Sequence, residues 1–157
     1  MSSIILEPKE KLTESKIINA EEEINLKLPS DYKKFLLRTN GGYPEKGAFM
    51  IDFGHDRIQI GHVNYFLSIY DGEHSNLVDY VKTYTERLPE GLLPVAYDDQ
   101  GNLVVLKING ENKGKVYFWD HDQEGYDDYD PEKPEMGFVA DNFDKFISEL
   151  GKADSST

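Results

Sequence analysis

The densest group of chemically capable side chains is an acidic run over residues 120–135, DHDQEGYDDYDPEKPE. Carboxylates this close repel one another, so the run must be solvated, bind a cation or face a basic partner. Tyrosines lie among the acids, and tyrosine is enriched in protein interfaces because it supplies contact area at low entropic cost. A solvated loop is the commonest outcome for a charge run, but the tyrosines favour a partner-binding loop. The candidate contact residues are Asp120, Asp122, Glu124, Tyr126, Asp127, Asp128, Tyr129 and Asp130.

Calcium binding is the second chemistry that this run could support. Residues 120–125 match the first half of an EF-hand loop, except that Glu124 stands at the third ligand position. The twelfth position requires a bidentate glutamate, and Pro131 occupies it. The preceding segment also has the pattern of a strand rather than a helix. We therefore expect no EF-hand, no metal site and no cofactor, while weak incidental binding of cations stays open.

Enzymatic chemistry finds little support in the sequence. His55–Asp56 and His121–Asp122 could be acid–base pairs, but neighbours along a strand point in opposite directions. The chain has no nucleophile elbow, P-loop, HExxH motif or glycine-rich dinucleotide loop. It has no cysteine, which excludes disulfides, thiolate chemistry and cysteine-type zinc sites. We expect a protein that is not an enzyme.

Charge and composition narrow the class of partner. The 157 residues contain 17 Lys+Arg and 30 Asp+Glu, for a net charge of −13. A chain this acidic should bind neither nucleic acid nor an anionic membrane, and it could attract a basic protein, chiefly by raising the association rate. Charge that only maintains solubility is an equal alternative. The N-terminus, MSSIILEPKEKL, does not resemble a signal peptide, and a cysteine-free chain fits a cytoplasmic location.

The candidate residues need elements to position them, and the pattern predicts helices at both ends with strands between. We expect helices over residues 13–24 (capped by Thr13), 30–39 (capped by Ser30), 75–87 (capped by Ser75) and 141–150 (capped by Asp141). Strands are expected over residues 48–53, 93–97, 103–108 and 115–119, with a longer, interrupted β-like region over 57–69 and a short extended entry to the last helix over 137–140. This order predicts a single α+β domain with a central, mostly antiparallel sheet, an N-terminal helix pair, a middle helix and a C-terminal helix.

Two of the predicted strands, 93–97 and 103–108, should form a hairpin around the turn DDQGN at residues 98–102. Polar turns held on rigid strands often carry binding residues. Asp98, Asp99 and Asn102 are therefore added to the candidate contact surface. We expect Trp119 to pack in the core, and Phe35 and Leu36 to be core residues of the second helix.

The segment LPSDYKKFLLRTNGG at residues 28–42 predicts a helix with marked ends, which Asn40 and Gly41 are expected to terminate. With the preceding acidic helix, LPEGLLPVA at 88–96, the DDQGN turn, GKVYFWDH at 114–121 and the closing FDKFISEL helix, it resembles the SUKH superfamily, the Smi/Knr-like domains. The resemblance covers a core of about residues 12–150 within one domain spanning 1–157, with residues 151–157 as a loose tail.

The resemblance implies a function that composition cannot supply. Bacterial members of this superfamily are mostly immunity proteins that bind and neutralise a cognate toxin, often a nuclease. Fungal relatives resemble regulatory scaffolds, which gives the alternative of a protein-binding domain without a toxin partner. Combined with the charge, immunity suggests electrostatic mimicry, in which carboxylates occupy the basic groove that a nuclease uses for phosphates.

Overall fold

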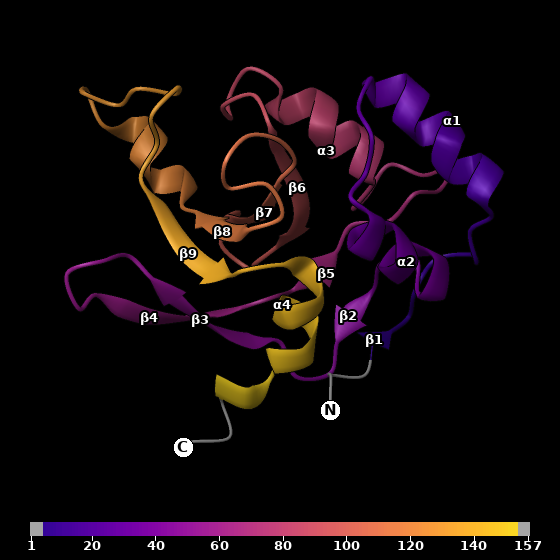
Figure 1. Ribbon diagram of the computed structural model, residues 1–157, viewed down its shortest axis with the longest axis horizontal. Coiled ribbons are helices and arrows are strands. Elements are labelled where there is room, and N and C mark those ends of the chain that lie inside the picture. Colours follow the sequence, from indigo (N-terminus) through magenta and orange to yellow (C-terminus); the bar gives the residue numbers. More distant parts are fainter. Residues whose placement is uncertain (1–4, 154–157) are drawn as a thin grey trace.

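The computed structural model describes residues 5–153, which form an α+β fold (Figure 1). Its helices are α1 (Glu14–Ile24), α2 (Ser30–Arg38), α3 (Leu77–Tyr84), the short 3-10 helix η1 (His121–Gly125) and α4 (Phe143–Glu149). Its strands are β1 (Ile5–Leu6), β2 (Tyr43–Pro44), β3 (Ala48–Asp52), β4 (Ile58–His62), β5 (Tyr65–Phe66), β6 (Leu92–Tyr97), β7 (Leu103–Lys107), β8 (Val116–Trp119) and β9 (Met136–Ala140).

The main sheet is antiparallel and contains seven strands of the described chain in the order β4-β3-β9-β8-β7-β6-β5. Strands β6, β7 and β8 are consecutive neighbours, so the predicted central hairpin and third strand are confirmed. The segment 137–140, expected only as an extended entry, forms β9, which lies between β8 and β3. The acidic residues 120–135 therefore form the connection that leaves the sheet at β8 and returns beside it at β9.

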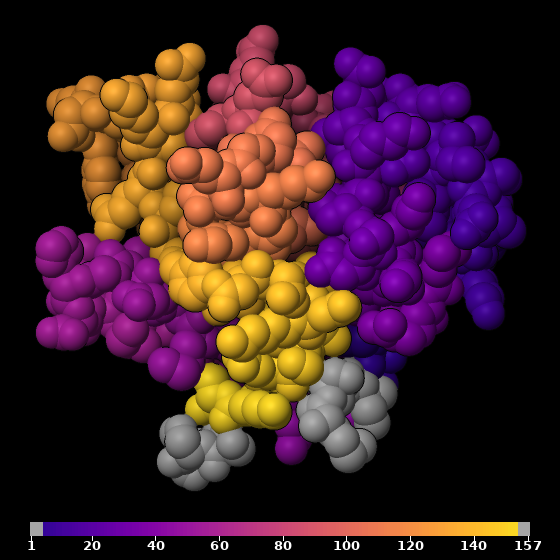
Figure 2. Space-filling view, viewed as in Figure 1, coloured from indigo at the N-terminus to yellow at the C-terminus, as the bar shows by residue number. Residues whose placement is uncertain are grey.

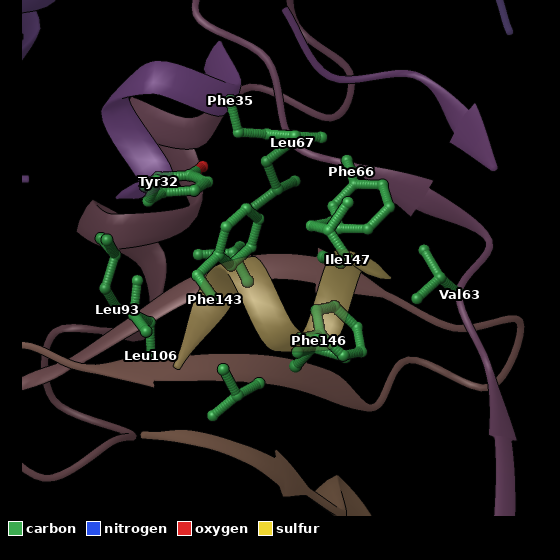
Figure 3. Close-up of a cluster of buried hydrophobic side chains, with 14 of the residues drawn as sticks. Tyr32, Phe35, Val63, Phe66, Leu67, Leu93, Leu106, Phe143, Phe146 and Ile147 are labelled. Atoms are coloured by element: carbon green, nitrogen blue, oxygen red, sulfur yellow. The ribbon is translucent and has the colours of Figure 1, made fainter. Parts of the chain in front are cut away.

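One face of this sheet carries the main core, where α2 and α4 bring aromatic rings together (Figure 3). Phe143 lies 5.0 Å from the ring of Tyr32 and 5.1 Å from that of Phe35, both edge-on. Phe35 and Leu36 are 2% and 0% exposed, so the predicted core face of α2 is confirmed. These contacts hold the N-terminal and C-terminal helices together over the same strands.

The opposite face is covered over only part of its width. Leu88, Leu103, Val105 and Trp119 form a second, smaller core there, against which Tyr80 and Tyr84 of α3 pack. Trp119 is fully buried, as predicted. The same face continues across β9, β3 and β4, where Met50, Ile58 and Ile60 are about half exposed at 55%, 48% and 48%. The sheet thus has one covered half and one open half on this side.

Helix starts show where local sequence reading succeeded and failed. Thr13 caps α1 as predicted, because its hydroxyl accepts from the backbone N–H of Lys16 at 3.3 Å. Two other caps lie one residue later than expected: α3 is capped by Asn76 and not by Ser75, and α4 is capped by Asn142 and not by Asp141. In both cases the asparagine amide oxygen accepts from the N–H three residues on, at 3.3 Å and 2.8 Å. Asparagine is as good a cap as aspartate or serine, so the backbone conformation decides which of two adjacent candidates caps the helix.

The second helix starts without a side-chain cap. Ser30 is the first helical residue rather than the cap, and Pro29 precedes it in an extended conformation with no side-chain hydrogen bond. The Pro29 carbonyl accepts from the N–H of Lys33 at 2.9 Å. The following Asp31 instead uses its carboxylate to bridge α2 to the N–H of Phe143 on α4, at 3.2 Å. The predicted Ser30 cap is therefore wrong.

The Asn-Gly-Gly that follows α2 joins three distant segments rather than ending the helix. Thr39 ends α2 in an extended conformation. Asn40 is 2% exposed, and its amide group donates to the carbonyls of Glu10 and Ile69 at 2.8 Å each and accepts from the N–H of Ile69 at 2.9 Å. Gly41 (φ +71°) lies against Ser68, where a Cβ would come within 2.1 Å of the hydroxyl oxygen. Position 41 therefore accepts only glycine.

The bounds of two further predicted elements differ from those in the structure. The predicted β-like region 57–69 divides into β4 and β5, and α3 is shorter than predicted, with only Leu77 and Val78 of its apolar residues buried. Residues 154–157 of the expected tail lie outside the described residues. The part of the chain that the structure describes contains no helix long and apolar enough to cross a membrane.

Candidate protein-binding surface

The turn at residues 98–102 is built around one carboxylate. Asp98 Oδ1 accepts from the backbone N–H groups of Gln100 and Asn102 at 2.9 Å each, and Oδ2 accepts from the Asn102 amide at 3.0 Å. Aspartate that bonds the backbone two residues on is a common turn device. Asn102 is 6% exposed, whereas Asp99 is exposed and accepts from the side-chain amide of Asn64. Asp98 therefore shapes the turn, and Asp99 lies at its surface.

The structure brings this turn and the acidic run together. Asn102 accepts from the backbone N–H of His121 at 3.1 Å, and His121 Nε2 lies 2.6 Å from the carbonyl oxygen of Gln100. Gly101 completes the contact, because a Cβ there would already touch the His121 ring at 3.3 Å. The two predicted segments, which are separated in sequence, thus share one face. His121, which the sequence suggests only as half of a poorly supported acid–base pair, is the residue that joins them.

Within the acidic run, several carboxylates order the backbone. Asp120 caps η1 by accepting from the N–H of Asp122 at 2.9 Å, and Asp130 accepts from the N–H of Glu132 at 3.0 Å. Gln123 closes the loop, since its amide oxygen accepts from the N–H of Glu135 at 2.9 Å and its amide nitrogen donates to the Glu135 carbonyl at 3.1 Å. The run is therefore a folded loop with its own hydrogen bonds.

Glu124 is engaged inside the chain by a cation that sequence reading missed. Arg87 donates to both its carboxylate oxygens, at 3.0 Å and 2.7 Å, and the guanidinium lies 4.3 Å from the centre of the Tyr84 ring. The hydrogen bond to Glu124 raises the pKa of Arg87. The pair anchors the acidic loop to the end of α3. No local pattern signals it, because the two residues are 37 positions apart.

The two tyrosines of the run lie in different environments. Tyr126 is 66% exposed, one of the most exposed large side chains described. Tyr129 turns inward, with its buried hydroxyl beside the Trp119 indole. Burial raises the pKa of Tyr129, and the nearby indole N–H of Trp119 offsets part of this effect. Neither the Tyr129 hydroxyl nor the Trp119 Nε1 forms a hydrogen bond of good geometry with a described residue. Tyr126 is therefore available to a partner, and Tyr129 supports the loop from below.

The remaining candidates form the exposed part of the surface. Asp127, Asp128 and Asp130 are exposed, and the Asp122 side chain is 78% exposed, 3.6 Å from His121. Among residues 5–153 no three His, Asp or Glu side chains converge as ligands of a metal ion. The carboxylates are spread along the loop, an arrangement that suits several separate cationic groups on a partner.

A hollow of about 720 Å³ lies elsewhere, between α1, the N-terminal segment and residues 69–72. Its walls carry both signs of charge, including Lys9, Lys16, Glu23 and Asp79. Lys9 already stacks over the Tyr70 ring at 4.7 Å, and Glu23 pairs with Lys82 at 2.7 Å. None of the predicted contact residues lines it.

Comparison with known proteins finds one family and two similar proteins. The model of the SMI1 / KNR4 family (SUKH-1) matches residues 11–149. The SPbeta prophage-derived uncharacterized protein YokK of Bacillus subtilis (strain 168) is 27% identical over 151 residues, covering 88% of this chain and 74% of that protein. A crystal structure of a protein from Pseudomonas syringae pv. tomato shares the fold at a TM-score of 0.50 and 18% identity, over 76% of this chain and 75% of the other.

Proposed function

The chain belongs to the SMI1/KNR4 (SUKH-1) family, and from this premise we propose that it is an immunity protein, which binds a cognate bacterial toxin and neutralises it. In this proposal it acts in the cytoplasm, by binding alone and without catalysis. The partner is a toxin with a basic surface, such as a nuclease. The acidic face made by residues 98–102 and 120–135 is its contact surface.

The observation that carries this proposal is the joining of two acidic segments into one face through His121. Together they hold ten carboxylates and a single lysine, Lys133. The carboxylates are Asp98, Asp99, Asp120, Asp122, Glu124, Asp127, Asp128, Asp130, Glu132 and Glu135. A third of the acids of the chain thus lie in about a seventh of its length, which supports a directed field rather than a uniformly charged surface.

The mechanism follows from how nucleases hold their substrate. Lys and Arg side chains in the toxin groove bind successive phosphates, and this contact dominates their affinity. Exposed carboxylates such as Asp127 and Asp128, spaced along an ordered loop, compete for the same cations. Tyr126 adds apolar contact area among them, as interface tyrosines do. Occupation of the groove excludes the nucleic acid.

The proposal is tested with the toxin that co-purifies with the protein from its native cell. The triple variant Asp127→Asn, Asp128→Asn and Asp130→Asn should bind that toxin with an association rate lowered about tenfold and should protect cells expressing it less well. Its stability should change by less than about 0.5 kcal/mol, because the substituted side chains are exposed.

A matched control separates the local surface from the total charge. Glu22→Gln, Glu111→Gln and Glu149→Gln remove the same three charges from exposed positions on α1, the turn after β7 and α4. This control should protect cells as the wild type does. Full protection by the aspartate variant, with an unchanged association rate, would exclude the acidic loop and direct the search to the turn at residues 43–47, where Tyr43 is 42% exposed.

A further inference from the structure

Strand β4 is the end strand of the main sheet, and among residues 5–153 no other strand pairs with its outer edge (Figure 1). The β3–β4 ladder fixes which backbone groups lie on that edge. Val63 donates to the Gly47 carbonyl and Phe53 to the Arg57 carbonyl, so the hydrogen-bonded pairs between them are Phe49–Gly61 and Ile51–Gln59. Ile58 and Ile60 therefore direct their N–H and C=O groups away from β3, outward along the open edge.

The side chains on this edge are apolar and lie on the open half of the sheet. Met50 and Ile60 are direct cross-strand partners, and Ile58 lies diagonally beside them. All three are about half exposed. The half-buried Phe138 of β9 continues the apolar stripe through its pairing with Asp52 and its edge-on contact with Tyr117 at 6.2 Å.

The usual devices that keep edge strands from pairing are absent here. Edge strands of soluble proteins are commonly blunted by lysine, proline, a bulge or an inward-pointing charge. Residues 58–62 read IQIGH and contain none of these residue types. The β3–β4 register runs through five pairs without a shift. The strand is regular and apolar on one face, which is the form of edge that pairs with another strand.

Charge decides which kind of partner suits this edge. Residues 48–62 carry only Asp52, Asp56 and Arg57 as fixed charges, and Arg57 pairs with Glu135 at 3.1 Å. Figure 2 shows the hairpin, in purple, as a lobe below the orange residues of the acidic loop. A basic protein would meet few carboxylates on β4. A second copy of this strongly acidic chain would also meet few like charges here, because residues 58–62 contain no carboxylate.

We infer that β4 pairs antiparallel with β4 of a second copy, joining two sheets into one. Ile60 lies at the middle of the strand, so full overlap places the two-fold axis there and sets Ile60 opposite its own copy. Such a contact is isologous, since each chain presents the same strand to the other. The stripe of Met50 and Ile60 then continues across both hairpins. This inference does not depend on toxin binding.

The mass of the full chain in solution tests the pairing. Wild-type protein measured by light scattering over a range of concentrations should reach twice the mass of one chain. Ile60→Lys should remain at the mass of one chain, because lysine at the axis places two like charges together. Ile18→Lys is the control, since Ile18 on α1 is 47% exposed, against 48% for Ile60. That variant should dimerise as the wild type does.

A second measurement covers the case in which Ile60→Lys fails to fold. The chain lacks cysteine, so Ile60→Cys and Ile18→Cys each introduce a unique thiol. Directly paired antiparallel residues lie at Cα distances that a disulfide can bridge. Ile60→Cys should therefore form covalent dimers on oxidation at least about tenfold faster than Ile18→Cys, because pairing raises the effective concentration. A monomeric wild type, or equal cross-linking of the two variants, would overturn the inference.

Discussion

The acidic loop and the β3–β4 hairpin are neighbouring projections that are stabilised in different ways. The loop is held by side chains: carboxylates bond its own backbone, Gln123 closes it, and Arg87 anchors it. The hairpin is held by its backbone ladder and by Phe49 and Ile51, which are buried in the main core, while Met50, Ile58 and Ile60 are about half exposed on its other face. The ion pair between Arg57 and Glu135 joins the two. The difference suggests that the charge of the acidic loop selects a different protein as partner, while the strand geometry of the hairpin selects a second copy of this chain.

The largest effect is expected from a change that removes both surfaces together. Phe35→Ala should lower the free energy of unfolding by about 3–5 kcal/mol, because Phe35 is 2% exposed and packs against Phe66 and Phe143. Urea denaturation measures the change. Lys34→Ala, on the exposed face of the same helix, should change stability by less than about 0.5 kcal/mol. An unchanged unfolding midpoint for Phe35→Ala would show that Phe35 does not contribute to the core as its burial indicates.

Raising the salt concentration should have opposite effects on binding at the two surfaces. Attraction between the acidic loop and a basic toxin is screened by salt, so the association rate should fall, on the order of tenfold between low and high ionic strength. Pairing of two β4 strands brings two net-negative chains together, so screening should strengthen the dimer over the same range. Stopped-flow mixing and sedimentation equilibrium measure the two responses. Responses of the same sign would contradict the division of roles.

A smaller and local effect is expected at the loop anchor. Arg87→Gln should lower stability by about 0.5–1 kcal/mol, since the pair with Glu124 is bidentate but the arginine side chain is 40% exposed. Backbone amide exchange should increase over residues 120–130 and stay unchanged in β3 and β4. Arg57→Gln is the control, because its pair with Glu135 is more exposed, at 56% and 60%, and should contribute less. Equal exchange in both variants would mean that Arg87 does not anchor the loop.

The fold was largely predictable because its elements are marked by local patterns. The apolar spacing of Tyr32, Phe35 and Leu36 gave the core face of α2, and the turn between β6 and β7 gave the central hairpin. The prediction of helix starts failed where two possible capping residues are adjacent in the sequence, as at Ser75 and Asn76. Sequence shows that both can cap, but not which one has the required backbone angles.

The candidate surface was predictable in its residues but not in its arrangement. Composition identified the acidic run and the turn at residues 98–102, while their contact through His121 depends on how β6, β7 and β8 pair. The two hydrogen bonds that Arg87 donates to Glu124 are equally non-local. The open edge of β4 depends on the order of strands in the sheet, which alternation in a single strand does not reveal.

Trp119 gives this chain an internal optical label. It is the only tryptophan in the sequence, is fully buried, and lies edge-on to Tyr84 at 5.8 Å and beside the hydroxyl of Tyr129. Its fluorescence emission should therefore shift to longer wavelength when the acidic loop lifts from the sheet and admits water. Events at the β4 edge take place away from this indole. One surface can thus be followed by intrinsic emission without a dye, and the other is silent at the same wavelength.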